Sequence, residues 1–159
     1  MNYEDIFYFS VAGESNTGKT GLVEKIIKEL RSKGYRVASL KHTKGDYSLD
    51  KEGKDTWRHR EAGSGLVIFS SPLETSFIFG GELKLDEILK KIDLKDEYDV
   101  LVIEGMKDID IPKVSMAGSN IDSDIEYDGD LEEIIDWIED NIEINEILNS
   151  LPKLDCGKC

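Results

Sequence analysis

Two patterns of apolar residues follow one another along this chain of 159 residues. Short continuous apolar runs are typical of buried strands, and stripes with an apolar residue every three or four positions are typical of amphipathic helices. Because the two patterns alternate, we predict an α/β fold with a largely parallel, partly mixed sheet. The most apolar run, Val100–Ile103, is expected to be buried on both faces, as central strands of parallel sheets are.

The same patterns set the expected boundaries of the elements. The expected strands are Ile6–Val11, Tyr35–Leu40, Leu66–Phe69, Thr75–Phe79, Val100–Ile103 and Lys113–Met116. The expected helices are Lys19–Lys33, Asp55–Ala62, Leu85–Ile92 and a last one with Leu131, Ile134, Ile135, Ile138 and Ile142 on its apolar face. Gly34 is expected to end the first helix in the left-handed conformation, and Asp130 with Glu133 has the spacing of a capping box.

A glycine-rich motif joins the first strand to the first helix. It reads G-x-x-x-x-G-K-T and consists of Gly13, Glu14, Ser15, Asn16, Thr17, Gly18, Lys19 and Thr20, with Gly21 following. In P-loop proteins the backbone amides of such a loop and the helix dipole bind phosphates. Lys19 is expected to reach the β- and γ-phosphates, and the Thr20 hydroxyl to ligate Mg2+. The alternative is a glycine-rich turn without a ligand, but the flanking strand and helix favour a three-layer sandwich of the P-loop NTPase type.

A carboxylate follows the most apolar strand. Glu104 comes directly after Ile103, and P-loop enzymes place an acidic residue there to hold Mg2+, directly or through water. Because Glu is one methylene longer than Asp, a water-bridged role is favoured; the residue could instead orient the attacking water, or merely end the strand. Gly105 would let the backbone approach a ligand closely.

A polar loop from Lys41 to Lys54 follows the second strand, at the sheet edge where open α/β folds bind ligands. Asp50 is the candidate for a second carboxylate near Mg2+, and with Lys19 and Glu104 it forms the candidate catalytic set. Candidates for anion contacts are Lys41, Lys54 and Arg58, although each could be an ordinary solvated charge. Residues 43–46, Thr-Lys-Gly-Asp, resemble the guanine-reading motif of GTPases but follow an early strand, so the sequence does not choose between GTP and ATP.

The net charge of −14 is unevenly distributed. Between Val114 and Pro152, 12 residues are acidic and none is Lys or Arg. An acidic surface repels nucleic acid and anionic membranes, so neither is expected as a partner, and we interpret the segment as a solvated helix face rather than a docking surface. The start of the chain is acidic, where a signal peptide is basic, and no apolar run approaches the length of a membrane span. Both cysteines lie in the last four residues, so no disulfide framework is expected, and a reducing cytoplasm is the expected location.

Several motifs together resemble the MobB family, molybdopterin-guanine dinucleotide biosynthesis protein B. They are residues 13–20, Leu40-Lys41-His42, Asp50-x-x-Gly53-Lys54-Asp55-x-x-Arg58, Glu61-Ala62-Gly63, Ile103-Glu104-Gly105-Met106-Lys107 and Pro112-Lys113. The chain departs from the family pattern at Lys44-Gly45, where further histidines are common, and at Glu52, where the family has Pro.

This resemblance implies a GTP-binding, homodimeric adapter with at most weak GTPase activity. Such proteins assist a MobA-type guanylyltransferase that attaches GMP to molybdopterin. The implied nucleotide-binding residues are the phosphate loop through Gly21, together with Lys41, Lys54, Asp55, Arg58, Gly105 and Lys107. The alternatives from other classes are a P-loop small-molecule kinase and an ATP-dependent metallochaperone. The lack of arginine after Lys113, where a lid could lie, counts against the kinase.

Both cysteines lie in the segment 147–159, which we separate as a tail from a nucleotide-binding domain of residues 1–146. Residues 151–159 look like the opening of segments that begin some iron–sulfur modules, but Cys156 and Cys159 supply only two thiolates. A dimer could combine four, two partners elsewhere could complete a zinc site, or the tail could be inert. The inert tail is favoured for the chain as given.

Overall fold

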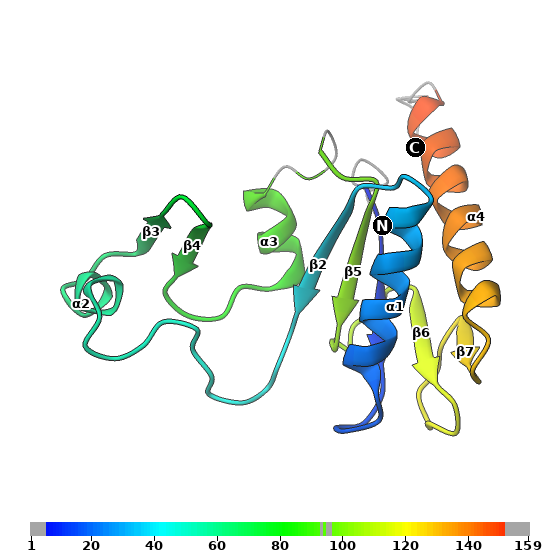
Figure 1. The fold of residues 1–159 in the computed structure, drawn as a ribbon, viewed down its shortest axis with the longest axis horizontal. Coiled ribbons are helices and arrows are strands. Elements are labelled where there is room, and N and C mark those ends of the chain that lie inside the picture. The colour runs from blue at the N-terminus through cyan, green and yellow to red at the C-terminus, as the bar shows by residue number, and fades with distance from the viewer. Residues whose placement is uncertain (1–5, 93, 95–96, 152–159) are drawn as a thin grey trace, which may run out of the picture. The chain divides into compact units, whose positions relative to one another are not determined.

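The computed structural model describes residues 6–92, 94 and 97–151 of the chain (Figure 1). The described residues form two compact units: those before and after the segment 44–92 form the first unit, and residues 44–92 form the second. This division lies within the predicted nucleotide-binding domain, and the sequence patterns do not reveal it. The predicted start of the tail at residue 147 falls inside the last helix, and both tail cysteines lie outside the described residues.

The first unit contains a five-stranded sheet with the order β2-β5-β1-β6-β7. Its strands are β1 (Phe7–Ala12), β2 (Val37–Lys41), β5 (Val100–Glu104), β6 (Lys113–Met116) and β7 (Ile125–Tyr127). Every neighbouring pair is parallel, so the prediction of an α/β fold with a largely parallel sheet is confirmed. In β5 every residue is buried, as its continuous apolar sequence predicts.

Two helices complete this unit, α1 (Lys19–Ser32) and α4 (Leu131–Ser150). They pack against each other and share one core with β1, β5 and β6. Trp137 of α4 lies edge-on to the rings of Phe7 and Phe9 of β1, at 5.9 and 5.7 Å between ring centroids. The apolar stripes of α1 and α4 are therefore buried against the sheet at the strand that leads into the phosphate loop.

The ends of these helices largely follow their sequence signals. Gly34 after α1 is left-handed, with φ 99°, as expected. At α4 the Asp130 carboxylate accepts hydrogen bonds from the amides of Glu132 and Glu133, at 2.9 and 3.4 Å. The amide of Asp130 itself donates to Asp128 Oδ1 at 3.1 Å, so the described cap uses Asp128 where a capping box would use Glu133.

The second unit contains α2 (Asp55–Glu61), the antiparallel pair β3 (Leu66–Ser70) and β4 (Thr75–Phe79), and α3 (Leu85–Lys91). The expected mixture of parallel and antiparallel pairing is thus divided between two sheets. Strand β7 was not predicted, because it has three residues and lies within the acidic segment without an apolar run.

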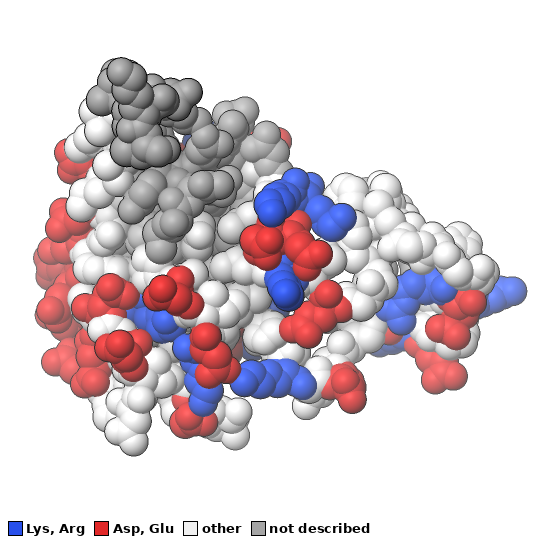
Figure 2. Space-filling view, turned by 180° about the vertical axis from the view of Figure 1, so that it is seen from behind, with Lys and Arg blue, Asp and Glu red and all other residues white. Residues whose placement is uncertain are grey.

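Acidic side chains gather on the first unit. Figure 2 shows them in red along the left edge of that view, where α4 lies. Among the described residues, no helix combines the length and the apolar character needed to cross a bilayer.

Candidate phosphate-binding site

The loop between β1 and α1 has the backbone that its glycines predict. Asn16 and Gly18 have positive φ angles of 63° and 91°. A Cβ atom added at Gly13 would meet Thr17 Oγ1 at 2.9 Å and Met116 Cγ at 3.0 Å. The close turn therefore depends on glycine at positions 13 and 18, which are the two glycines of the motif.

The N-terminus of α1 is open to an anion. Its N-cap residue is Gly18, which has no capping side chain, and the first turn contains no acidic residue. The first amides of a helix have no partner within the helix, and the dipole adds positive potential there. A phosphate can satisfy both, so the start of α1 has the properties of a phosphate site.

Lys19 lies across the start of the loop. Its ammonium donates a hydrogen bond to the carbonyl oxygen of Gly13 at 2.9 Å and another to that of Glu14. A cation held in this way lies within the loop that would surround the phosphates. The contact of Lys19 with the β- and γ-phosphates stays a prediction.

Glu104 forms the centre of the polar contacts beneath the loop. Its Oε1 accepts hydrogen bonds from Thr20 Oγ1 at 2.8 Å and from Lys41 Nζ at 2.6 Å. Burial pushes the pKa of Glu104 upward, but the hydrogen bonds from Lys41 and Thr20 and the charges of Lys41 and Lys19 outweigh it, so the pKa is lowered. Glu104 is thus held as a carboxylate next to the predicted Mg2+ ligand, Thr20.

The turn after β5 is hydrogen-bonded to the neighbouring strand β1. Ser10 Oγ donates to the Gly105 carbonyl at 2.5 Å, and the Gly105 amide donates to Val11 at 3.1 Å. Gly105 has φ 102°, and an added Cβ would lie 2.8 Å from the carbonyl oxygen of His42. The backbone that approaches Gly105 closely in this structure is therefore that of His42.

Lys107 contacts the phosphate loop through Glu14. The two side chains form an ion pair of 2.8 Å, and both are accessible to solvent. The hydrogen bond from Lys107 and its charge lower the pKa of Glu14, and the same contact raises the pKa of Lys107. This pair neutralises the one carboxylate within the loop motif.

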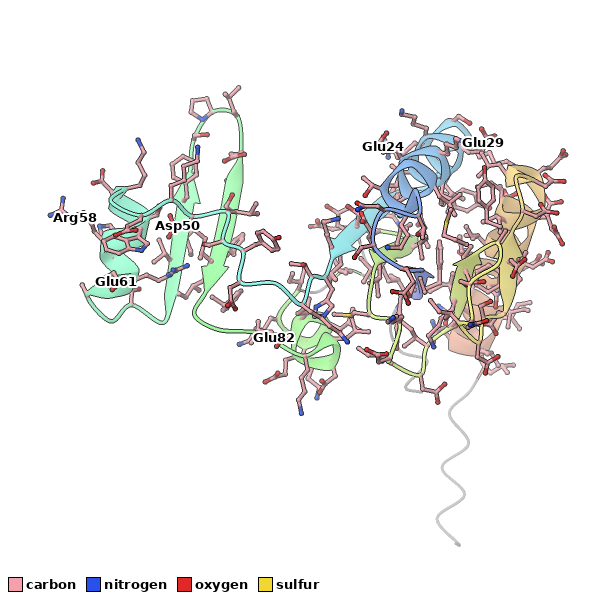
Figure 3. The ribbon with its side chains drawn as sticks, turned by 90° about the horizontal axis from the view of Figure 1, so that it is seen from below. Glu24, Glu29, Asp50, Arg58, Glu61 and Glu82 are labelled. Atoms are coloured by element: carbon pink, nitrogen blue, oxygen red, sulfur yellow. The ribbon has the colours of Figure 1, made fainter. Side chains whose placement is uncertain are left out.

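Four of the predicted residues, Asp50, Lys54, Asp55 and Arg58, belong to the second unit. The Asp50 carboxylate is buried, accepts a hydrogen bond from Thr56 Oγ1 at 2.7 Å and lies 3.8 Å from Arg60. Arg58 points outward from α2 (Figure 3). Asp50 thus holds α2 in place within its own unit, and its role near Mg2+ stays a prediction.

A pocket of about 450 Å³ lies beside the phosphate loop in the first unit. It is lined by Glu14, Lys107, Asp108, Ile109, Asp110, Lys113, Asn120, Ile121 and Asp122. These side chains come from the loop, from the connection between β5 and β6, from the first residue of β6, Lys113, and from the connection between β6 and β7. Sequence reasoning did not single out the residues after Lys113, because they carry no motif and only the fold brings them to the phosphate loop.

The chain matches the family model described as "Molybdopterin guanine dinucleotide synthesis protein B", MobB, over residues 8–140. The chain belongs to the MobB family. It is 37% identical over 106 residues to the "Molybdopterin-guanine dinucleotide biosynthesis adapter protein" of Haemophilus influenzae, a match covering 65% of this chain and 59% of that protein. It is 32% identical over 163 residues to the putative adapter protein of Methanocaldococcus jannaschii, covering 94% of this chain and 65% of that protein. The chain thus spans less than two thirds of the length of these MobB relatives.

Solved structures support the fold. A crystal structure titled molybdopterin-guanine biosynthesis protein B (MobB) has a TM-score of 0.64 and 21% identity, covering 86% of this chain and 99% of that chain. Bacillus subtilis MobB gives a TM-score of 0.61 with 24% identity, covering 76% and 77%. At these identities the similarity concerns the fold, and it agrees with the α/β class predicted from the sequence.

The described residues contain no cluster of three or more His, Cys, Asp or Glu that could hold a metal ion. Thr20 and Glu104, which the sequence names as Mg2+ ligands, lie together, whereas Asp50 belongs to the other unit. The proposed iron–sulfur or zinc ligands, Cys156 and Cys159, are outside the described residues.

Proposed function

We propose that this chain is a GTP-binding adapter of molybdopterin guanine dinucleotide biosynthesis, active in the cytoplasm. The observation that carries the proposal is the phosphate loop with an open helix N-terminus, within a chain of the MobB family. The names of its relatives, which describe biosynthesis adapter proteins, support the pathway. The glycine-rich loop is the evidence for nucleotide binding.

The residues of the loop would bind the triphosphate without covalent chemistry. The amides at the start of α1 would donate to phosphate oxygens, and Lys19 would exchange its carbonyl partners for the β- and γ-phosphates. Because Glu14 is already paired with Lys107, its charge repels the phosphates less than a free carboxylate would. The loop therefore suits an anion despite its acidic residue.

Mg2+ fits the oxygen donors beneath the loop. Mg2+ is usually bound by one or two protein oxygens together with substrate phosphates and water, and Thr20 Oγ1 and the Glu104 carboxylate are such donors. When bound, the ion would neutralise charge on the phosphates. The ammonium of Lys41 donates to the same carboxylate oxygen of Glu104 that Thr20 contacts. A positive charge therefore already lies next to the proposed Mg2+ ligands.

We propose that hydrolysis of GTP is weak. Fast P-loop GTPases stabilise the transferred phosphoryl group with an arginine. In the first unit, Arg31 lies in the last turn of α1, and Arg36 forms a salt bridge of 2.6 Å with Asp99. The basic side chains described at the loop are Lys19, Lys41 and Lys107, which supply charge without the planar fork of arginine.

The proposed partners are a MobA-type guanylyltransferase and a second copy of this chain. Support for the homodimer comes from the β3–β4 pair, where Ile68 and Phe77 lie opposite each other and are 57% and 62% exposed. A two-stranded hairpin is marginal alone, and exposed apolar patches mark interfaces. Molybdopterin would reach the assembly through the guanylyltransferase or by direct contact.

The test is a competition between GTP and ATP for the purified chain, with and without Mg2+. We expect GTP to bind more tightly with Mg2+ present, and Lys19→Ala to abolish GTP binding while the circular dichroism spectrum stays unchanged. Lys28→Ala is the matched control, because Lys28 lies on the same helix and is exposed. Normal GTP affinity in Lys19→Ala would reject the proposal.

A further inference from the structure

The end of α4 lies outside the core that the rest of this helix shares with the sheet. The buried residues of α4 are Ile134, Ile135, Ile138 and Ile142, and none of the residues from Glu143 to Ser150 is buried. In Figure 1 this end of α4 extends beyond the end of α1, its neighbour in the core. Most helical stability in proteins comes from the packing of an apolar face. Within the described residues, the last two turns of α4 lack such packing.

These turns nevertheless carry an apolar stripe of their own. Ile144, Ile147 and Leu148 have the i, i+3, i+4 spacing of one helix face, and they are 52%, 52% and 39% exposed. With about 3.6 residues per turn, Ile144 and Ile147 lie on the side of the helix opposite to that of Ile138 and Ile142. The stripe is therefore a second apolar face and not the edge of the core. Exposed apolar side chains at this spacing are typical of a surface that another helix covers.

Acidic residues continue the same face toward the start of the helix. Asp140 precedes Ile144 by four positions and Glu143 precedes Ile147 by four, so each carboxylate neighbours an isoleucine of the stripe. Both acidic residues are exposed, and among the described contacts neither carboxylate forms a hydrogen bond or an ion pair. Acidic residues alone would agree with the solvated helix face that the sequence predicts, but the apolar stripe beside them does not.

The end of α4 also lacks the positive charge that usually stabilises a helix C-terminus. Its last turn contains no basic residue, and neither Lys nor Arg occurs between Val114 and Pro152. The helix dipole places partial negative charge at this end. The apolar stripe therefore lies between the carboxylates of Asp140 and Glu143 on one side and the negative end of the dipole on the other.

This distribution of charge decides among the candidate occupants of the stripe. A second copy of α4 would bring like charges together, and an anionic membrane surface would be repelled. A helix with apolar residues at the same spacing and with Lys or Arg beside them would cover the stripe and pair with the carboxylates. We propose that the last two turns of α4 bind a basic amphipathic helix of a partner protein. The inference goes beyond the proposed function, because it needs neither the phosphate loop nor a nucleotide.

The test uses the full chain and three synthetic peptides of about 18 residues, long enough to form a helix. The first contains Leu and Lys placed so that a helix has one apolar and one basic face. The second has Glu in place of each Lys, and the third has the composition of the first in scrambled order. Fluorescence anisotropy of labelled peptides gives the dissociation constants.

Two double variants remove the two parts of the surface. Ile144→Ser with Ile147→Ser removes the stripe, and its control is Leu49→Ser with Ile92→Ser, two exposed apolar residues of the second unit. Asp140→Asn with Glu143→Gln removes the neighbouring charge. Its control is Glu132→Gln with Glu133→Gln, which neutralises two exposed carboxylates in the first turn of the same helix.

The parent should bind the Leu–Lys peptide at least tenfold more tightly than the other two peptides. Loss of the stripe should weaken this binding about tenfold or more, because a few central side chains carry most of the energy of an interface. Loss of the two carboxylates should weaken it by a smaller factor that shrinks as salt is added. Both control variants should keep the dissociation constant of the parent.

The inference is overturned if the parent binds none of the peptides, or binds the Leu–Glu peptide as tightly as the Leu–Lys peptide. It is also overturned if Ile144→Ser with Ile147→Ser keeps the affinity of the parent, since charge anywhere on the acidic surface would then hold the peptide. A parent dimer that dissociates in this variant would assign the stripe to a second copy. Binding to phosphatidylglycerol vesicles that this variant loses would assign it to a membrane, and either result overturns the inference.

Two further measurements separate this surface from other effects. The circular dichroism spectrum of each variant should match that of the parent, and Ile144→Leu with Ile147→Leu should restore peptide binding if the stripe acts through its apolar surface. GTP binding should be the same in all these variants and in the parent. Failure of the proposed function would appear as a parent that does not bind GTP, with peptide binding unaffected.

Discussion

At the scale of single residues, Glu104 shows what a sequence motif can and cannot predict. Its place at the end of a buried strand predicts a functional carboxylate, and the structure brings it to Thr20 of the glycine-rich loop. Lys41 was proposed as an anion contact, yet its described partner is Glu104. Lys41 and Glu104 are 63 positions apart and meet because β2 and β5 are neighbours in parallel register.

Glu104 also predicts a dependence of stability on pH. Because the pKa of Glu104 is lowered in the fold, its contribution is present above the ordinary pKa of 4.5 and is lost as the pH falls through the lower folded pKa. We expect Glu104→Gln to lower the free energy of unfolding by about 1–2 kcal/mol at pH 7, since hydrogen bonds to a charged group are lost.

The measurement is urea unfolding of both proteins between pH 7 and pH 3. The difference between Glu104→Gln and the parent should shrink below pH 4.5. A difference that stays constant over this range would show that the charge of Glu104 does not stabilise the fold. Asp140→Asn, at an exposed position on α4, is the control. Its free energy of unfolding should stay close to that of the parent over the whole pH range.

At the scale of elements, the hairpin of β3 and β4 shows how a correct strand prediction leaves the partner open. Both strands were predicted from their apolar runs. Helix α2 packs against β3, where Val67 is buried, but the face with Ile68 and Phe77 has no cover in the described structure. An apolar run predicts that a strand face is buried. It does not predict whether the burying partner belongs to the same chain or to another.

We therefore expect the double variant Ile68→Ser with Phe77→Ser to convert a dimer to a monomer. Two exposed apolar side chains opposite each other would form the centre of a two-fold contact, and their removal would take away most of its binding energy. The measurement is sedimentation velocity or light scattering at about 10–100 μM protein, a range in which a micromolar dimer is populated.

Leu73→Ser is the control. Leu73 lies in the turn that joins β3 to β4, outside the paired residues, and its side chain is 96% exposed. It should keep the oligomeric state of the parent. A parent chain that stays monomeric over the whole concentration range would contradict the dimer and leave the open face to another partner.

At the scale of the whole molecule, the dominant feature is the uneven charge. The net charge is −14, and acidic side chains gather along the edge where α4 lies (Figure 2). Described salt bridges relieve part of this repulsion, as between Lys33 and Glu139 at 2.7 Å. Like charges on one surface repel each other, which destabilises the compact state and disfavours the approach of polyanions.

We accordingly expect salt to stabilise the protein. Raising NaCl from about 20 to 300 mM shortens the Debye length to below 10 Å and screens the repulsion on α4. The melting temperature should rise by roughly 2–4 °C, corresponding to about 1 kcal/mol for a chain of this size. Differential scanning calorimetry measures the shift directly.

A variant with Asp140→Asn, Glu143→Gln and Glu146→Gln should respond less to salt, because it carries fewer charges on the same helix. Replacing NaCl by an uncharged solute at equal osmolality is a further control and should not reproduce the shift. A melting temperature that falls with NaCl would mean that attractive pairs outweigh repulsion.

The sequence by itself determined the local chemistry of this protein. The alternating apolar patterns predict the strands and helices because the buried face of each element recurs with the period of that element along the sequence. The loop from Gly13 to Thr20 predicts a phosphate site because its conformation depends on glycines within that short segment. These features need no distant partner, so they can be read along the chain.

Only the tertiary structure decided which distant residues meet. It joined Lys41 to Glu104, tied Lys107 to Glu14, and placed Asn120 and Asp122 beside the loop. It also divided residues that the sequence treats as one domain into two units. The physical reason is that strand order and crossover connections set these contacts, and neither leaves a periodic signal in the residues that the contacts join.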